Sequence, residues 1–170
     1  HLPGEPARQS RPRLLLRLVG VIRLRNKAVK FVAGWEGWRP CPYWDAIGRV
    51  WTQGYGESQG VGPNSPCWTE KYGRKRLRKR LKKDYAPFIP RRRRMLPREI
   101  AALASFAYNC GPGAVSNPAI STLARRLKGP EGKTYKGRKR IYREELPKWT
   151  SGGIPGLVKR RAAEVKLACE

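Results

Sequence analysis

Apolar residues follow two different patterns along the chain. They recur at helical spacing before Trp35 and again after Thr69, whereas the segment between these points is rich in aromatic residues and closely spaced glycines. The first pattern predicts helices. The second predicts a small antiparallel sheet over about 43–58, with turns at Gly48 and at Gly54 to Gly56. We therefore predict an α+β fold in which a β-containing lobe precedes a mostly helical lobe.

The strongest helix signal lies in the C-terminal half of the chain. Pro97 suits a first helical position, and the residues after Glu99, IAALASFAYNC, carry no charge. A helix that is apolar on all sides is buried on all sides, so 97–110 is predicted to be the core helix. Other helices are expected over about 26–35 with Asn26 as N-cap, 69–85 with Thr69 as N-cap, 121–128, 139–149 and 157–169.

The first 25 residues differ from the rest of the chain. Three prolines precede LLLRLVGVIRLR, whose apolar positions suit a short basic amphipathic helix. This segment fits either an extra helix lying on the body or a cationic membrane-active element. Its arginines interrupt the apolar run, so we predict neither a membrane span nor a signal peptide. We expect 1–25 to be a basic extension and 26–170 to be one domain, with lobes at about 36–66 and 69–170.

The charge balance is strongly basic. The chain has 38 Lys and Arg against 12 Asp and Glu, a net charge of +26, which attracts nucleic acid, anionic lipid or an acidic cell envelope. Basic residues are densest over 71–83 and at 91–94, where either a solvated helix face or a surface for a polyanion fits. The sequence has no RNA-recognition or helix-turn-helix signature, so we do not expect specific nucleic-acid binding.

The metal-ligating residue types are scarce. The four cysteines lack CxxC spacing and the one histidine is His1, so no zinc ligand set is present and we expect no metal or other cofactor. Cys41 and Cys67 flank the glycine-rich segment. A disulfide in an oxidising compartment and two free thiols are both consistent with this spacing.

The candidate chemistry is concentrated in Trp35 to Gly56. Glu36 follows a predicted helix, Asp45 precedes a turn, and Thr52 lies in a β-prone run. Two carboxylates facing each other across a cleft, with a hydroxyl beside them, would suit glycoside hydrolysis. Two of these residues also have a structural alternative, because Asp45 can cap its turn and Thr52 favours a strand. The four tryptophans of this segment suit either sugar stacking or core packing.

The run EGWRPCPYWDAIGRVWTQGYG resembles the signature of phage-type lysozymes, glycoside hydrolase family 24, which reads E-G-x-R, Y-x-D and G-x-x-T-x-G-Y-G. Three later segments resemble that family in the same order: LPREIAALASFAYNCGPGAV, STLARRLKG and WTSGGIPGLVKRRAAE. The resemblance covers about 26–169, and it implies a lysozyme-like α+β fold around a buried central helix.

The resemblance also implies roles for individual residues. Glu36 would be the general acid, Asp45 the base or electrostatic partner, and Thr52 the residue that helps to hold the attacking water. The expected substrate-binding residues are Tyr43, Asn109 and Arg160. Either Arg160 or its neighbour Arg161 would support the active-site side of the last helix, although an interlobe salt bridge or a plain helix surface explains these arginines as well.

The sequence departs from the family pattern at two places. The segment Gly48 to Thr52 is one residue longer than the pattern, and a slip of one residue reverses the face to which a strand side chain points. A bulge could absorb the extra residue and restore the direction of Thr52. The second departure is Glu57, where relatives often have histidine, so any ion pair formed there is changed.

These observations predict an endolysin, a muramidase that hydrolyses the β-1,4 bond between N-acetylmuramic acid and N-acetylglucosamine in bacterial peptidoglycan. The resemblance favours inversion, for which the two carboxyl groups lie roughly 6.5 to 9.5 Å apart. We expect a monomer that is held in the host cytoplasm before release, acts in the periplasm or cell wall, and is concentrated there by its charge. The alternative is a cationic antibacterial protein that disrupts membranes through residues 11–25 and 71–94 on the same scaffold.

Overall fold

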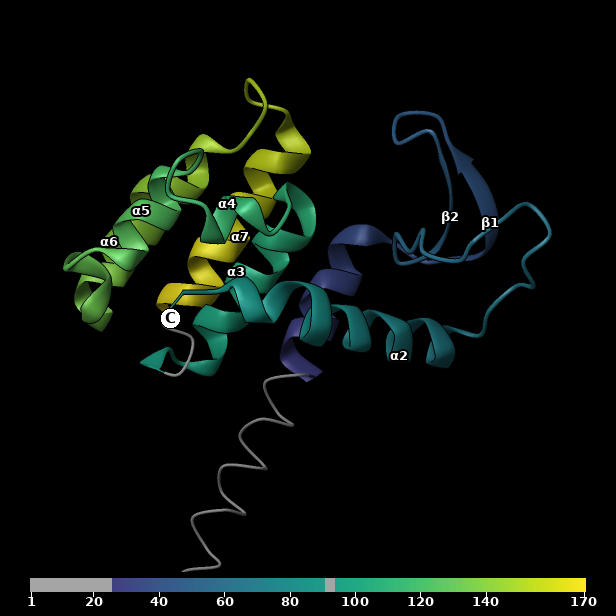
Figure 1. Ribbon diagram of the computed structural model, residues 1–170, viewed down its shortest axis with the longest axis horizontal. Coiled ribbons are helices and arrows are strands. Elements are labelled where there is room, and N and C mark those ends of the chain that lie inside the picture. The colour runs from purple at the N-terminus through teal and green to yellow at the C-terminus, as the bar shows by residue number, and fades with distance from the viewer. Residues whose placement is uncertain (1–25, 91–93) are drawn as a thin grey trace, which may run out of the picture.

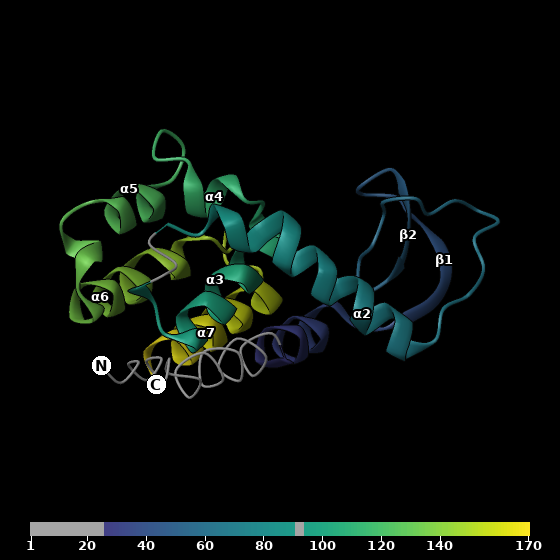
Figure 2. The ribbon, with the colours of Figure 1, turned by 60° about the horizontal axis from the view of Figure 1, so that its bottom comes forward.

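The computed structural model describes residues 26–90 and 94–170; the predicted extension at 1–25 and most of the arginine run at 91–94 lie outside the described residues. The molecule has two lobes joined by one long helix, α2 (Glu70–Arg80), as Figures 1 and 2 both show. The small lobe contains an antiparallel hairpin of β1 (Arg39–Asp45) and β2 (Val50–Gly54). The predicted α+β fold is confirmed.

The large lobe is built around α3 (Pro97–Cys110), which has the bounds predicted from the sequence. It packs against α7 (Pro155–Cys169), and the other helices of this lobe are α4 (Gly113–Ser116), α5 (Thr122–Lys128) and α6 (Tyr135–Glu145). Helix α6 begins four residues before the expected start because Thr134 caps it by accepting a hydrogen bond from Gly137 N (3.1 Å). The helical path then tightens into a 3₁₀ turn at Leu146–Lys148, which contains Pro147.

Two predictions about N-caps have different outcomes. Thr69 caps α2 as predicted, because its hydroxyl accepts a hydrogen bond from Tyr72 N (3.3 Å). Asn26, in contrast, is itself helical, and its side-chain oxygen accepts from Arg78 Nη2 (3.1 Å). The predicted cap at Asn26 is therefore wrong, because its acceptor is used to join the helix over 26–36 to α2.

One hydrophobic core connects the two lobes. The buried cluster includes Val32 of the helix over 26–36, Tyr55 of the small lobe, Leu77 of α2 and Phe106 of α3. At the far side of α3, the buried carboxylate of Glu99 is fully paired by other side chains. The shared core means that the relative position of the lobes is fixed by packing in the described residues.

The small lobe is tied to the start of α2 by covalent and polar contacts. Cys41 of β1 and Cys67 form a disulfide, which is one of the two alternatives that the sequence left open. Gln53 Nε2 donates to the carbonyl oxygens of Pro40 (2.6 Å) and Pro66 (2.8 Å) in the same region. Within the described residues, no helix is both long and apolar enough to cross a membrane.

We expect Gly73→Ala to destabilise the protein although alanine favours helices. A Cβ on this buried residue of α2 would lie 2.1 Å from the Trp38 ring, so the ring must move. Overpacking of this kind costs about 1 to 3 kcal/mol of unfolding free energy. The matched control is Gly34→Ala, also in a helix, where nothing lies within 4 Å of the added methyl group. In urea denaturation, the unfolding free energy should fall for Gly73→Ala and stay unchanged for Gly34→Ala. Equal stability of the two variants would contradict the packing argument.

Candidate functional site

Glu36 lies where both lobes meet. It is the last residue of the helix over 26–36, and Gly37 turns the chain away with a positive φ of 69°. Glu36 Oε1 accepts a hydrogen bond from Arg160 Nη1 of α7 (2.8 Å). A Cβ placed on Gly56 would lie 3.7 Å from Glu36 Oε2, so this second oxygen faces the Gly-Tyr-Gly turn, residues 54–56. No hydrogen bond joins Oε2 to another of the described residues.

Arg160 is held by a buried polar network. Its side chain is 6% exposed, Nε lies 3.3 Å from Glu164 Oε1, and Nη2 donates to the carbonyl oxygen of Ser105 (3.2 Å). The Ser105 hydroxyl donates in turn to Glu164 Oε1 (2.7 Å). Burial raises the pKa of Glu164, although Arg161 and Arg160 act in the opposite direction. Contacts with Glu164 and Ser105 therefore fix the Arg160 guanidinium that binds Glu36.

Asn109 belongs to the same network. It is exposed at the last turn of α3, and its Oδ1 accepts from Arg161 Nη2 (2.9 Å). Arg161 is buried and also pairs with Glu164 (2.9 Å). Both Arg160 and Arg161 contact Glu164. Asn109, which Arg161 binds, is thus linked through this glutamate to Glu36, which Arg160 binds. The sequence analysis missed this glutamate, whose signal was its spacing of three and four residues from the arginines on one helix.

The register of the hairpin places three predicted site residues on one face. Asp45 pairs with Val50, and Tyr43 pairs with Thr52. Directly paired residues and alternate residues of a strand share a face, so Asp45, Tyr43 and Thr52 lie on the same side of the hairpin. The pairing therefore sets Thr52 on the face of Asp45, in spite of the longer turn.

The extra residue is accommodated in the turn itself. Residues 46–49 form a four-residue connection, and Arg49 adopts a positive φ of 51°, which is uncommon for a residue with a side chain. The irregularity in the pairing lies farther from the turn, between Arg39 and Tyr43. The pairing of Thr52, Trp51 and Val50 is regular, so the register beside Thr52 does not depend on a bulge of the kind that the sequence allowed.

Asp45 uses one oxygen to cap the turn. Oδ1 accepts from Ile47 N (3.0 Å) and Gly48 N (3.2 Å), as the structural alternative predicted. Its Oδ2 has no hydrogen bond to another of the described residues, and a Cβ at Gly48 would lie only 2.9 Å from it. Capping and chemistry are compatible here, because the fixed Oδ1 leaves Oδ2 available to accept a hydrogen bond from water.

The other two hairpin residues of the predicted site are Thr52 and Tyr43. Thr52 is 5% exposed, and its hydroxyl donates to the Val50 carbonyl oxygen (3.4 Å). The half-buried ring of Tyr43 lies 4.3 Å from the Arg39 guanidinium. The predicted residues thus form two groups, one around Glu36 on the helical side and one on the hairpin. No hydrogen bond or ion pair between described residues joins the hairpin group to Glu36.

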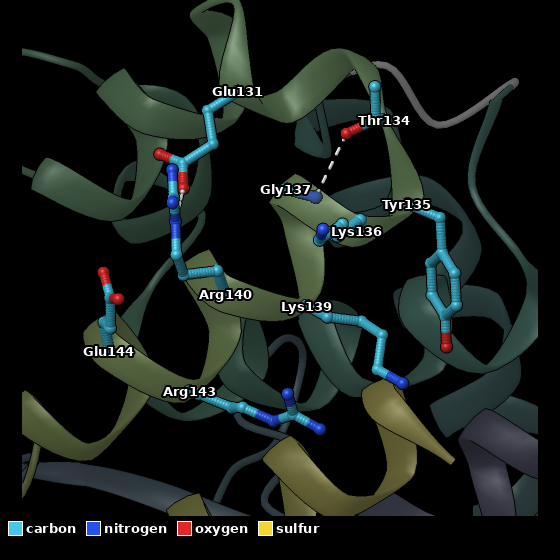
Figure 3. Close-up of a pocket in the computed structure, with 9 residues that line it drawn as sticks. All are labelled: Glu131, Thr134, Tyr135, Lys136, Gly137, Lys139, Arg140, Arg143 and Glu144. Atoms are coloured by element: carbon cyan, nitrogen blue, oxygen red, sulfur yellow. Dashed lines mark hydrogen bonds and ion pairs between the residues drawn. The ribbon is translucent and has the colours of Figure 1, made fainter.

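A cavity of about 790 Å³ on the large lobe lacks the free carboxylates that the candidate site has. It lies beside α6, and none of the predicted site residues lines it (Figure 3). Both of its carboxylates are engaged, since Glu131 pairs with Arg126 and Arg140, and Glu144 pairs with Arg126 (2.6 Å). No candidate acid and base are therefore free within it. Among the described residues there is also no cluster of side chains that could hold a metal ion.

Three solved structures share this fold. The active form of the P1 phage endolysin Lyz is 21% identical, with a TM-score of 0.68 and 96% of both chains covered. The muramidase domain of SpmX from Asticaccaulis excentricus is 22% identical, with a TM-score of 0.64, and the match covers 84% of this chain and 95% of that domain. The endolysin from Escherichia coli O157:H7 phage FAHEc1 is 21% identical, with a TM-score of 0.60, and the match covers 85% of this chain and 91% of the endolysin.

Similarity in sequence gives the family. No curated protein matches the chain significantly. The family model described as phage lysozyme, however, matches residues 33–164, which include Glu36, the whole hairpin and the Arg160 network. Since this match spans most of the chain, the protein belongs to the phage lysozyme family and is a glycoside hydrolase.

Proposed function

We propose that this lysozyme hydrolyses the β-1,4 bond between N-acetylmuramic acid and N-acetylglucosamine in peptidoglycan. Family membership supports muramidase-type action on the cell wall. The observation that carries the assignment is the asymmetric setting of Glu36, whose Oε1 is held by Arg160 while Oε2 faces the Gly-Tyr-Gly turn without a partner among the described residues. A general acid needs one oriented oxygen that is free to give its proton to the substrate.

The hairpin residues supply the other half of the reaction. In the proposed mechanism, Glu36 Oε2 protonates the glycosidic oxygen, and the free Oδ2 of Asp45 accepts a proton from the attacking water. Thr52 shares the face of Asp45 and helps to hold that water. Tyr43 and Asn109 contact the glycan, with Asn109 oriented by Arg161. Attack by water from the face opposite the leaving group inverts the anomeric centre.

The experiment that tests this function separates hydrolysis from membrane damage. Clearing of purified peptidoglycan, which contains no membrane, is the expected activity, and liposomes of anionic lipid loaded with dye should stay intact under the same conditions. Leakage without clearing would favour the competing membrane-disrupting function.

We also propose that the protein is a monomeric endolysin, held in the host cytoplasm before release and acting in the periplasm or cell wall. A monomer is consistent with a site whose proposed residues all come from one chain. Light scattering of the purified protein measures the oligomeric state, and fractionation of infected cells before and after lysis measures the location.

We propose that anionic surfaces, which the net charge of +26 attracts, bind along α2. Four exposed lysines, spaced by four, four and three residues, lie on one side of α2 and the turn after it: Lys71, Lys75, Lys79 and Lys82. None of them forms an ion pair with a carboxylate in residues 26–90 or 94–170. A row of unneutralised cations is attracted to phosphate-bearing envelope surfaces at low ionic strength.

Replacing these four lysines by glutamine should slow lysis of whole cells by about tenfold at low salt. The difference should disappear near 1 M salt, where the Debye length falls to about 3 Å. Hydrolysis of soluble glycan chains should not change. The matched control removes four charges near α6: Lys133, Lys136, Lys139 and Arg143. An equal loss in both variants would mean that total charge, and not the α2 row, drives envelope binding.

A further inference from the structure

Arg80 differs from the exposed basic residues of α2 because its side chain turns toward the small lobe. It is 16% exposed, and its guanidinium lies 3.3 Å from Glu57 Oε1 and 3.6 Å from Asp84 Oδ2. Glu57 is buried and also pairs with Arg76 (3.3 Å). The departure noted at Glu57 thus places a carboxylate against two arginines of α2, directly after the Gly-Tyr-Gly turn, residues 54–56.

Both of the last carbonyl groups of this turn are held by side chains from helices. Arg80 Nη1 donates to the Gly56 carbonyl oxygen (3.3 Å), and Tyr108 Oη of α3 donates to the Tyr55 carbonyl oxygen (2.6 Å). The Arg80 guanidinium also lies 5.4 Å from the Tyr108 ring and donates to Tyr85 Oη (2.9 Å). Arg80 and Tyr108 therefore support each other as well as the turn.

Gly56 connects the contacts of Arg80 and Tyr108 to Glu36. A Cβ on Gly56 would lie 3.5 Å from Tyr108 Oη and 3.7 Å from Glu36 Oε2, so its main chain forms the wall that faces the free carboxyl oxygen. Gly56 has a positive φ of 81°, which glycine adopts without steric cost. Such a turn can adopt other conformations unless its carbonyl groups are held, and Arg80 holds the one at Gly56.

We propose that Arg80 is a positioning residue for Glu36 and acts through the Gly56 carbonyl group. The inference rests on the proposed function, in which Glu36 is the general acid. By fixing the main chain beside Oε2, Arg80 sets the direction in which this oxygen presents its proton, without contacting the substrate itself. Its effect should fall on kcat, because a displacement of about 1 Å in a catalytic group can cost about 100-fold in rate.

The test measures kcat and KM on soluble glycan chains for Arg80→Met and Tyr108→Phe. Both should lower kcat by about 10- to 100-fold and leave KM within about twofold, since ground-state binding is not altered. Tyr108→Phe removes only the hydrogen bond to the turn, and it provides a readout if Arg80→Met folds poorly. Arg80→Lys, which keeps the charge on a single donor nitrogen, should recover part of kcat. The matched control, Arg125→Met at an exposed position of α5, should behave as the wild type.

The same variants in a Glu36→Gln background separate positioning from general support of the fold. If Arg80 acts through Glu36, Arg80→Met should cause no further loss of the residual activity there. An equal loss in both backgrounds would overturn the positioning role. Wild-type kcat in Arg80→Met and Tyr108→Phe, with a lowered kcat in Glu36→Gln, would overturn it as well. Full activity of Glu36→Gln would instead overturn the assignment of the general acid and, with it, this inference.

Discussion

Glu36→Gln should lower kcat/KM on peptidoglycan by about 100- to 10,000-fold, the contribution of a positioned general acid. Glutamine has nearly the same shape, and its side-chain oxygen can still accept from Arg160 Nη1 at the position of Oε1. What the variant lacks is an acidic proton at Oε2, the oxygen that faces Gly56. Release of reducing sugar ends measures the rate, and urea denaturation checks that the variant is folded.

The control for charge is Glu170→Gln, which removes one exposed carboxylate that pairs with Lys166 and not with the Arg160 network. It should retain wild-type activity. A Glu36→Gln variant that is folded and clears peptidoglycan as fast as this control would show that another group supplies the proton.

Arg160→Met should be the most destabilising single change at the site. It leaves the buried carboxylate of Glu164 with one arginine and removes the ion pair to Glu36. Breaking a buried ion pair by removing one partner costs about 3 to 5 kcal/mol of unfolding free energy. Activity should fall as well, because the carboxylate of Glu36 loses the contact that orients it. The same substitution at Arg140, which is 66% exposed, should cost at most about 1 kcal/mol.

The loss of unfolding free energy in Arg160→Met should also depend on pH. Burial raises the pKa of Glu164 above its ordinary value, and removal of Arg160 removes one of the charges that lower it. A group whose pKa is raised by folding favours the folded state below its unfolded pKa, and this contribution is lost as the pH rises through the folded pKa. The stability deficit of the variant should therefore be smaller in acid than at neutral pH. A deficit that is constant across this range would contradict the role of Glu164.

Local sequence signals predicted the elements better than the contacts between them. The bounds of α3 were predictable because Pro97 suits a first helical position, the residues after Glu99 carry no charge, and Gly111 follows the helix. The start of α6 was missed because the cap at Thr134 lies before the apolar positions that mark this helix. Asn26 has good capping chemistry but uses its oxygen for a contact with Arg78, 52 residues away in sequence, which no local pattern encodes.

In the candidate site, too, local sequence signals predicted residues better than they predicted contacts. Motif resemblance pointed to Glu36, Asp45 and Thr52, but it left the direction of Thr52 open, because a longer turn permits more than one register. Pairing across the hairpin decides between these registers, and the left-handed conformation of Arg49 takes up the extra residue. The contact of Arg160 with Glu36 joins residues 124 positions apart, and it depends on how α7 is placed relative to the helix over 26–36.

Analysis of the products distinguishes hydrolysis with Glu36 as the acid from other ways of cleaving the glycan. Purified peptidoglycan should be digested in water labelled with oxygen-18, and the fragments should be examined by mass spectrometry and by NMR of the first-formed anomer. We expect labelled reducing ends on N-acetylmuramic acid, produced with inversion and absent from the Glu36→Gln digest. Anhydro ends without label, or reducing ends on N-acetylglucosamine, would contradict this expectation.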